Sequence, residues 1–251
     1  MTEHDTKNFI MSVAGHSFYI HALYGDAYKL CKDYLTTDPA EIEINISLRD
    51  VEYENLKEEN KRFYSRNGYL ETLAIYRKIS EAILDFDTFL MHGAVVAHDG
   101  KAYMFTAPSG TGKTTHIRKW LDNLDDVYVV NGDKPLVKIV EKGAIACGTP
   151  WCGKEGLGKN CLVPLKAIVL MERGENNKIK EISFNDAFNS LLRQVYMPEN
   201  SEKMRKTLTL IAQLKEKVKF YKFTFNNMKE DTFIVAYKAL TNNSQYKQNA
   251  D

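Results

Sequence analysis

The chain has 251 residues, of which 44% are hydrophobic and 27% charged, so it can bury one large core or one core with a small accessory domain. Its 34 basic and 33 acidic residues leave a formal net charge of +1, which excludes a global electrostatic field for nucleic acid or an anionic membrane. No apolar run approaches the roughly 20 residues of a membrane span, and the first residues lack the basic-then-apolar layout of a signal peptide. We therefore expect a cytoplasmic protein without nucleic-acid or membrane partners.

We expect residues 1–65 to form a small α+β accessory region. Its expected elements, in chain order, are strands over 8–13 and 17–21, a helix over 26–35 and a strand over 41–46. The last of these alternates strictly between polar and apolar side chains, which is typical of a half-exposed strand. The highly charged stretch 51–67 is expected to cover a sheet edge or to form an exposed loop.

We expect residues 66–240 to form the main core. Apolar side chains recur at helical spacing from 70 to 86. The apolar runs 93–97 and 101–106 then flank an Asp-Gly turn, and Asp-Gly between two apolar runs is a strong hairpin signal. Because the two strands of a hairpin are antiparallel, the sequence predicts a mixed sheet rather than an all-parallel sheet built from crossover units.

The rest of the core region alternates between strands and helices. The expected strands are 127–131, 136–140, 144–147, 165–171 and 220–225, and the expected helices are 113–124, 184–196 and 201–217, with a last helix after a capping box at Asn227 and Glu230. The helices of 184–217 can supply the interface of a homo-oligomer. The polar tail 241–251 is expected to be disordered.

The segment 107–114 follows a predicted strand, opens a predicted helix and matches the spacing of a phosphate-binding P-loop, with Ala107 where glycine is more usual. In such a loop the backbone N–H groups and the helix N-terminus hold the phosphates of a nucleotide. Lys113 places a positive charge between the β- and γ-phosphates, and the Thr114 hydroxyl is a ligand of Mg²⁺. The expected nucleotide-binding residues are Ser109, Gly110, Thr111, Gly112, Lys113, Thr114 and Thr115. A chance match in a surface loop is the alternative.

Asp133 lies just beyond the end of the apolar strand 127–131, one helix and one strand after Lys113. A carboxylate at this place can hold Mg²⁺ or accept a proton from an incoming hydroxyl group. The alternative is an aspartate that only forms the turn between Gly132 and Pro135.

These residues resemble two related families, ATP-dependent phosphoenolpyruvate carboxykinase and bacterial HPr kinase/phosphorylase. The similarity rests on SGTGKTT at 109–115, on the Gly-Asp that follows the next strand, and on the apolar stretch 90–96, which contains the Leu-Met-His-Gly-Ala-Val pattern around His92. It covers about residues 88–175 and is closest to small HPr-kinase-like proteins, including those found beside peptide-modification genes. The resemblance implies an α/β fold with a mixed-sheet P-loop core, a small N-terminal α+β layer and C-terminal helices. It also makes the main core, residues 66–240, P-loop kinase-like.

By the same resemblance, His92 lies beside the transferred phosphoryl group and assists Asp133. Its alternative is a histidine with satisfied hydrogen bonds at the start of a strand. The chain departs from the families at Asp133-Lys134, where they carry two adjacent aspartates, and it lacks their downstream Glu-Ile-Arg-Gly signature.

A second loop with several glycines, residues 148–160 (the glycine loop), occupies the corresponding region and is able to close over the site. Within it, Glu155 is the candidate for the missing metal-binding carboxylate, and Lys154 is a candidate contact for phosphate or for an acidic substrate. A solvated Lys-Glu pair in a surface turn is the alternative.

Other candidates carry less information. Two arginines are candidate substrate contacts. Arg173 follows a predicted strand near the rim, and Arg193 lies on an otherwise apolar helix, where a guanidinium needs an anionic partner, either a carboxylate or a bound phosphate. His116 in the first turn of the P-loop helix is expected to pack. Cys147, Cys152 and Cys161 fit no standard zinc spacing and are interpreted as buried thiols or loop-packing residues.

The leading hypothesis is a phosphotransferase that uses ATP and Mg²⁺, with Asp133, His92 and Lys113 as catalytic residues and Thr114, Asp133 and Glu155 as metal ligands. The acceptor is a serine or threonine hydroxyl of a protein or peptide, or a small hydroxylated metabolite. Phosphorolysis of phosphoserine, the reverse activity, is implied by the resemblance alone. Two alternatives stay open: a nucleotide-binding regulator with little turnover, and a phosphoenolpyruvate carboxykinase-like enzyme. A switch GTPase is disfavoured because no Asn-Lys-x-Asp motif is present.

Overall fold

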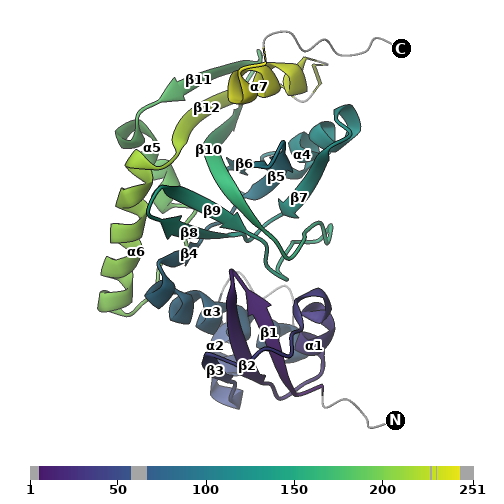
Figure 1. Ribbon diagram of the computed structural model, residues 1–251, viewed down its shortest axis with the longest axis vertical. Coiled ribbons are helices and arrows are strands. Elements are labelled where there is room, and N and C mark those ends of the chain that lie inside the picture. The colour runs from purple at the N-terminus through teal and green to yellow at the C-terminus, as the bar shows by residue number, and fades with distance from the viewer. Residues whose placement is uncertain (1–5, 58–66, 227, 230, 244–251) are drawn as a thin grey trace.

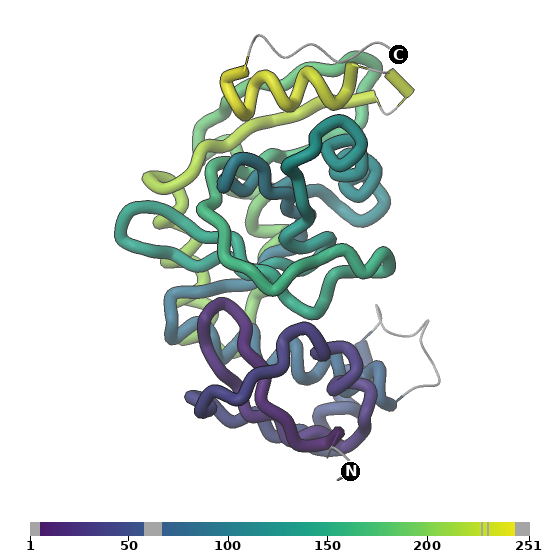
Figure 2. Tube along the Cα trace, turned by 45° about the vertical axis from the view of Figure 1, so that its right-hand side comes forward, coloured from purple at the N-terminus to yellow at the C-terminus, as the bar shows by residue number. Residues whose placement is uncertain are grey.

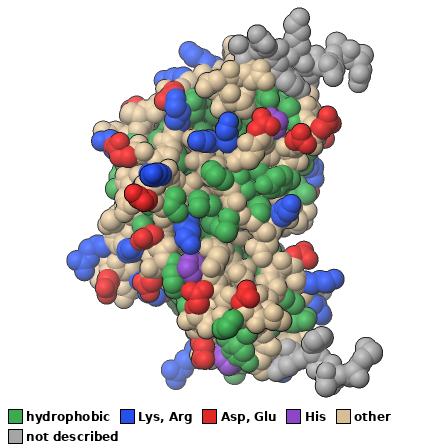
Figure 3. Space-filling view, viewed as in Figure 1, with side chains coloured by type: hydrophobic (Ala, Val, Ile, Leu, Met, Phe, Trp, Pro, Cys, Tyr) green, Lys and Arg blue, Asp and Glu red, His purple; other side chains and the backbone are tan. Residues whose placement is uncertain are grey.

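The structure is a computed structural model that describes residues 6–57, 67–226, 228–229 and 231–243. A small N-terminal layer with its own sheet lies at one end of a larger body, whose mixed sheet is strongly curled (Figure 1). The predicted mixed α/β architecture is confirmed. Across the described ranges, no helix has the combination of length and apolarity that crossing a membrane requires. On the face seen in Figure 3, basic and acidic side chains interleave, as the balanced composition predicts.

The N-terminal layer is a sheet in the order β1-β2-β3 with short helices beside it. Its elements are β1 (Asn8–Val13), β2 (His16–His21), α1 (Asp26–Leu30), η1 (Lys32–Tyr34), β3 (Ile42–Asn45) and α2 (Leu48–Leu56). The first two strands form the expected hairpin, and β3 joins β2 in parallel. Helix α2 occupies the first part of the stretch predicted to be a loop or an edge cover, because Ser47 and Asp50 form a capping box that starts a helix there. The remainder of that stretch, 58–66, lies outside the described residues.

Helix α3 (Asn67–Ala82), which continues into η3 (Ile83–Phe86), covers the N-terminal sheet. Its buried side chains Leu70, Ile75 and Ile79 share one hydrophobic cluster with residues of β1 and β2. The helix that follows the accessory region in the sequence therefore packs against that region, and it also leads directly into the first strand of the larger sheet.

A buried carboxyl group fastens α3 to the turn that follows β2. Glu71 is fully buried and accepts hydrogen bonds from the backbone N–H groups of Leu23 and Tyr24, the latter at 3.1 Å. Burial raises the pKa of Glu71 above its ordinary value of 4.5, and the two backbone donors offset that rise only in part.

The larger sheet has the order β4-β8-β9-β10-β6-β5-β7, with β12 paired to β10 and β11 paired to β12. Its strands are β4 (Thr88–Leu90), β5 (Ala94–His98), β6 (Lys101–Thr106), β7 (Val127–Asn131), β8 (Leu136–Val140), β9 (Gly143–Cys147), β10 (Leu162–Arg173), β11 (Lys178–Ile182) and β12 (Lys219–Phe225). Strand β10 pairs with β9 through its first residues and with β6 through later ones, so one long strand joins the two halves of the sheet and curls it. Strands β4 and β11 were not predicted, since β4 is very short and β11 is mostly exposed.

The direction of β5 determines which chain segments lie together at one edge of this sheet. Strand β5 runs antiparallel to β6, as the hairpin signal predicts, and antiparallel to β7. Strands β6 and β7 therefore point the same way, and β10 and β12 are parallel to β6. The start of β5 consequently lies at the same edge as the ends of β6, β7, β10 and β12. The second predicted hairpin, β8–β9, is also confirmed.

Helices cover both faces of the sheet (Figures 1 and 2). They are α4 (Lys113–Asn123) and α7 (Thr232–Thr241) on one face, and α5 (Phe184–Leu192) and α6 (Ser201–Gln213) with η4 (Leu214–Glu216) on the other. Alternate residues of β6 divide between the two faces: Phe105 packs with Trp120 of α4, and Met104 packs with the cluster that includes α5 and α6. The expected capping box at 227 and 230 and the tail beyond 243 lie outside the described residues.

The buried Glu71 predicts a pH dependence of stability. Because its pKa is raised in the folded state, its contribution to the free energy of unfolding is complete below 4.5 and is lost as the pH rises through the raised folded value. We expect Glu71→Gln to remove this loss, since the amide stays neutral at every pH and still offers an oxygen to one backbone donor. Urea unfolding between about pH 4 and 8, the range around these pKa values, measures it.

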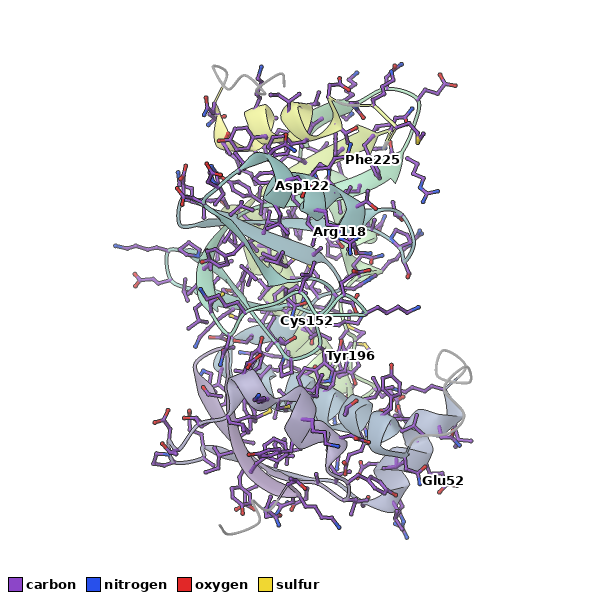
Figure 4. The ribbon with its side chains drawn as sticks, turned by 90° about the vertical axis from the view of Figure 1, so that its right-hand side faces the viewer. Glu52, Arg118, Asp122, Cys152, Tyr196 and Phe225 are labelled. Atoms are coloured by element: carbon purple, nitrogen blue, oxygen red, sulfur yellow. The ribbon has the colours of Figure 1, made fainter. Side chains whose placement is uncertain are left out.

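The matched control is Glu52→Gln, at an exposed glutamate of α2 (Figure 4). It is expected to follow the pH profile of the unsubstituted protein. Parallel pH profiles for Glu71→Gln and the unsubstituted protein contradict the prediction.

Candidate functional site

Three chain segments meet at the sheet edge that the β5 direction creates. They are the glycine-rich loop 107–112 after β6, the pair Gly132-Asp133 after β7, and His92-Gly93 before β5. Gly93 N–H donates to the carbonyl of Asp133 at 2.9 Å, and the Thr106 hydroxyl donates to the carbonyl of His92 at 2.7 Å. These bonds fasten the three segments to one another, so the predicted catalytic residues lie at one place.

Asp133 lies between two basic side chains. Its Oδ1 is 3.2 Å from His92 Nε2, and its Oδ2 is 3.4 Å from Lys134 Nζ. Burial alone raises the pKa of this carboxyl group, but the His92 hydrogen bond and the Lys134 charge outweigh burial and lower the pKa below its ordinary 3.8. Asp133 is therefore ionised at neutral pH, and a third of its side chain is open to solvent.

The backbone of the glycine-rich loop is one that glycine alone adopts easily. Gly110 has φ +76° and Gly112 has φ +122°, and both values lie in the left-handed region. Gly112 is the N-cap of α4 and offers no side-chain cap, so its turn leaves helix N–H groups to an anion. Thr114 is half-buried, whereas Ser109 and Thr115 are exposed.

Lys113 is folded back inside this loop. Only 7% of the residue is exposed, and its Nζ donates to the carbonyls of Ala107 at 2.9 Å and Pro108 at 3.4 Å. Burial lowers the pKa of Lys113 to about 8, although the Asp133 charge opposes the fall. An anion bound beside this buried ammonium group would stabilise its charged form.

Arg173 holds the outer side of the same loop. Its guanidinium donates to the carbonyl of Gly110 at 2.7 Å and to the carbonyl of Thr111 at 3.0 Å. The arginine that we expected to contact substrate from the rim thus binds the carbonyl side of the loop, which leaves the N–H side to face the opposite direction.

The loop 148–160 lies against the turn that carries Asp133. A Cβ on Gly132 would lie 2.9 Å from the Cys152 carbonyl, and a Cβ on Gly153 would lie 3.0 Å from Asp133 Cβ. Such approaches are possible only with glycine at both positions. Gly153 of this loop therefore permits close packing beside Asp133.

Asn131 is a site residue that our sequence reasoning missed. It is fully buried, and its Oδ1 accepts from the N–H groups of Asp133 at 2.8 Å and Lys134 at 2.7 Å. Its Nδ2 donates to the carbonyl and the hydroxyl of Thr149 at 3.0 and 2.9 Å. One amide thus fixes the Asp133 turn and the start of the glycine loop. An asparagine at the end of an apolar strand was the available signal.

The two charged residues of the glycine loop, Lys154 and Glu155, are open to solvent, and neither forms an ion pair or hydrogen bond with Asp133 in the described part of the chain. Glu155 forms an ion pair with Arg118 of α4. Figure 4 shows Arg118 above Cys152, at the level of the P-loop helix. Within the described ranges, no group of three or more His, Cys, Asp or Glu side chains is arranged to hold a metal ion.

Arg193 is exposed at the C-cap of α5, and its neighbour Gln194 contacts the site. Gln194 Oε1 is 2.9 Å from His92 Nδ1, and its carbonyl accepts from the His92 N–H at 2.6 Å. The two residues are 102 positions apart, so no local pattern in the sequence could reveal this contact.

The remaining candidates pack. Burial lowers the pKa of His116 to about 3, and its Nε2 accepts from the indole N–H of Trp120 at 3.2 Å. The cysteines are free thiols, and burial raises the pKa of Cys147 to about 12 and that of Cys152 to about 11. These thiols are protonated at neutral pH.

Helix α3 of the N-terminal layer forms one rim of the site. Burial raises the pKa of Tyr69, in the first turn of α3, and the negative charge of Asp133 adds to that rise. Trp151 of the glycine loop packs against Tyr76 in a tilted arrangement, with ring centroids 5.2 Å apart, and its indole N–H donates to the Thr72 carbonyl at 3.2 Å. The glycine loop is therefore held between α3 and the sheet edge.

Comparison with models of known protein families gives no match, and no curated protein matches the chain.

The contacts of Arg173 predict how the glycine-rich loop moves. We expect Arg173→Ala to speed hydrogen exchange of the amides in residues 109–115 by about fivefold, the equivalent of about 1 kcal/mol lost from local hydrogen bonding. The free energy of global unfolding is expected to change little. Mass-spectrometric hydrogen exchange measures both regions at once.

Arg205→Ala, at an exposed arginine of α6, is the control and is expected to leave the loop amides unchanged. Equal exchange rates in Arg173→Ala and the unsubstituted protein would show that the arginine does not restrain the loop.

Proposed function

We propose that this protein is a kinase that transfers the γ-phosphate of ATP to a hydroxyl group with the help of Mg²⁺. The observation that carries the proposal is the contact between Asp133 and His92 at the same sheet edge as Lys113 and the glycine-rich loop. A nucleotide-binding loop alone is compatible with many activities. A carboxylate that can accept the proton of a hydroxyl group, held beside a phosphate-binding loop, is an arrangement that serves phosphoryl transfer to that hydroxyl.

The loop residues suit the triphosphate of ATP. The N–H side of 109–115 and the start of α4 offer donors to phosphate oxygens, and Lys113 adds a buried positive charge. Mg²⁺, when bound, would supply positive charge that offsets the negative charge developing on the phosphate oxygens. Thr114 and Asp133 are the residues that would hold the ion, and Glu155 joins them only if its pair with Arg118 opens.

Asp133 is the residue that receives the proton of the acceptor hydroxyl. Its lowered pKa keeps it ionised, and in a loose transition state the proton moves late, so orienting the hydroxyl matters more than basicity. The Lys134 ammonium group lies beside the other carboxylate oxygen of Asp133 and offsets negative charge near the γ-phosphate. Lys154 and the exposed Arg193 are candidates for contact with the acceptor, which is a protein, a peptide or a small hydroxylated metabolite.

The finer fold assignment belongs to the same proposal. A P-loop core of the HPr kinase/phosphoenolpyruvate carboxykinase type is supported by the antiparallel β5 between β6 and β7 and by the motif residues at 90–96, 109–115 and 132–133. The kinase reading is preferred over carboxykinase chemistry because the chain is much shorter than that family.

One observation favours a second candidate, a nucleotide-binding regulator with little turnover. Lys134 occupies the position next to Asp133 and pairs with it, where the families carry another carboxylate. Tight ATP binding without ADP production, with or without acceptors, would identify this function.

The kinase proposal predicts a specific loss in Asp133→Asn. Removing the carboxylate charge is expected to lower phosphoryl transfer by about 10²- to 10⁴-fold, the usual contribution of a general base, while ATP affinity changes by only a few-fold. The assay uses γ-labelled ATP with a panel of serine- and threonine-containing peptides and hydroxylated metabolites.

Asp99→Asn is the matched control, because Asp99 is an exposed aspartate in the β5–β6 turn at the opposite edge of the sheet. It is expected to keep full activity. Full transfer by Asp133→Asn would refute the assigned role of the carboxylate.

The pKa of Lys113 predicts a pH dependence of ATP binding. The free protein loses the Lys113 proton near pH 8, and the phosphates require the charged form, so binding takes up a proton above that pH. Affinity is expected to fall by about tenfold per pH unit above about 8. Titration calorimetry in buffers of different ionisation enthalpy measures both the affinity and the proton uptake.

Lys113→Arg provides the comparison, since a guanidinium stays charged over this range. Its ATP affinity, whatever its absolute value, is expected to be flat with pH. A flat profile and no proton uptake in the unsubstituted protein would contradict the prediction.

A further inference from the structure

The segment after α5 runs antiparallel to the residues that lead into β5. The His92 N–H donates to the Gln194 carbonyl at 2.6 Å, and two residues on, the Tyr196 N–H donates to the Leu90 carbonyl at 3.0 Å. The backbone of His92 is therefore held by a part of the chain that belongs to the helical face of the molecule, and Tyr196 marks this segment in Figure 4.

Gln194 also holds the ring of the same histidine. Its side-chain oxygen is 2.9 Å from His92 Nδ1, while the other ring nitrogen, Nε2, is 3.2 Å from Asp133 Oδ1. The imidazole thus bridges an amide and a carboxylate. The His92 side chain is 22% exposed, and its two polar contacts orient the ring.

The chemistry of the two partners sets where the ring carries hydrogen. An amide oxygen and an ionised carboxylate can each only accept, so the ring nitrogen that faces each of them carries a hydrogen atom. With Nδ1–H directed to Gln194, Nε2–H is directed to Asp133. A partner on one ring nitrogen that fixes the orientation of the other is a common arrangement at histidines with a chemical role.

We propose that Gln194 is a positioning residue, which holds the His92 ring against Asp133 so that this carboxylate faces the acceptor hydroxyl. The inference rests on the proposed kinase function and adds a residue to it. In the transfer step, the acceptor O–H bond breaks and its proton passes to the Asp133 carboxylate. The acceptor oxygen bonds to the γ-phosphorus, and the bond from that phosphorus to the β–γ bridging oxygen breaks, so ADP leaves with the electron pair. Gln194 touches none of the reacting atoms and acts through His92.

The first test is spectroscopic and needs no activity. Nuclear magnetic resonance of ring-labelled histidine reports which nitrogen of His92 carries hydrogen, and a His92→Ala spectrum assigns the signal. Gln194→Leu, which keeps the size and removes the amide, is expected to shift the His92 ring nitrogen signals. Gln194→Glu keeps an accepting oxygen and is expected to preserve hydrogen on Nδ1. The backbone bond from His92 to residue 194 stays in every variant.

The second test is kinetic. Gln194→Leu is expected to lower kcat by about tenfold, the equivalent of one hydrogen bond to a charged group, with KM for ATP within about twofold. Gln194→Glu is expected to recover part of this loss. In a His92→Ala background, Gln194→Leu is expected to have no further effect, because a residue that acts only through His92 has nothing left to position. Asn189→Leu, at an exposed amide of α5, is the control.

The outcomes separate the two proposals. Unchanged His92 ring signals in Gln194→Leu overturn the positioning role, and so does a loss of kcat that is the same with and without His92. If no acceptor is phosphorylated by the unsubstituted protein, the kinase function fails, and the ring signals alone decide whether Gln194 fixes His92 against Asp133.

Discussion

The direction of strand β5 is the constraint on which the site depends. A strand that runs antiparallel to both of its neighbours brings its own start to the edge where both neighbours end. Residues before β5 and after β7 thereby meet the loop after β6, although they are separated by tens of residues along the chain. If β5 were parallel to β6, His92 would lie at the opposite edge, and Asp133 would have lost the partner that lowers its pKa.

A buried amide extends this arrangement beyond the sheet. Asn131 fixes the backbone of the Asp133 turn and, through Thr149, the start of the glycine loop. Trp151 then ties the same loop to α3, which packs on the N-terminal sheet. The N-terminal layer is thus connected to the Asp133 turn through a short series of side chains, and it contributes a rim to the site rather than lying apart from it.

What could be predicted from the sequence follows from the range of the interactions. The Asp-Gly turn at Asp99 specifies its hairpin within a few residues, and the spacing of the motif alone indicates the glycine-rich loop. The central strands and this loop were therefore predictable. Strand β10 was foreseen only in part, because its two ends pair with different strands and such pairing has no local pattern. The contact between Gln194 and His92 could not be predicted for the same reason. The sequence pattern indicated the neighbouring Arg193 instead, because of its charge.

The charges around the glycine-rich loop say which kind of ligand the edge can accept. Three basic side chains lie around the loop, those of Lys113, Lys134 and Arg173, whereas Asp133 contributes one carboxylate. Glu155 forms an ion pair with Arg118, so its charge is offset. The two pKa shifts have different causes: burial lowers the pKa of Lys113 and so disfavours its charged form, whereas basic neighbours lower the pKa of Asp133 and so favour its charged form. A polyanion at the loop reverses the first effect, because it supplies the partner that a buried ammonium lacks. It weakens the second, because added negative charge raises the pKa of a carboxylate nearby. Anion binding at this edge therefore makes Lys113 more positive and Asp133 more ready to hold a proton, which is the change that accepting a proton from a hydroxyl demands.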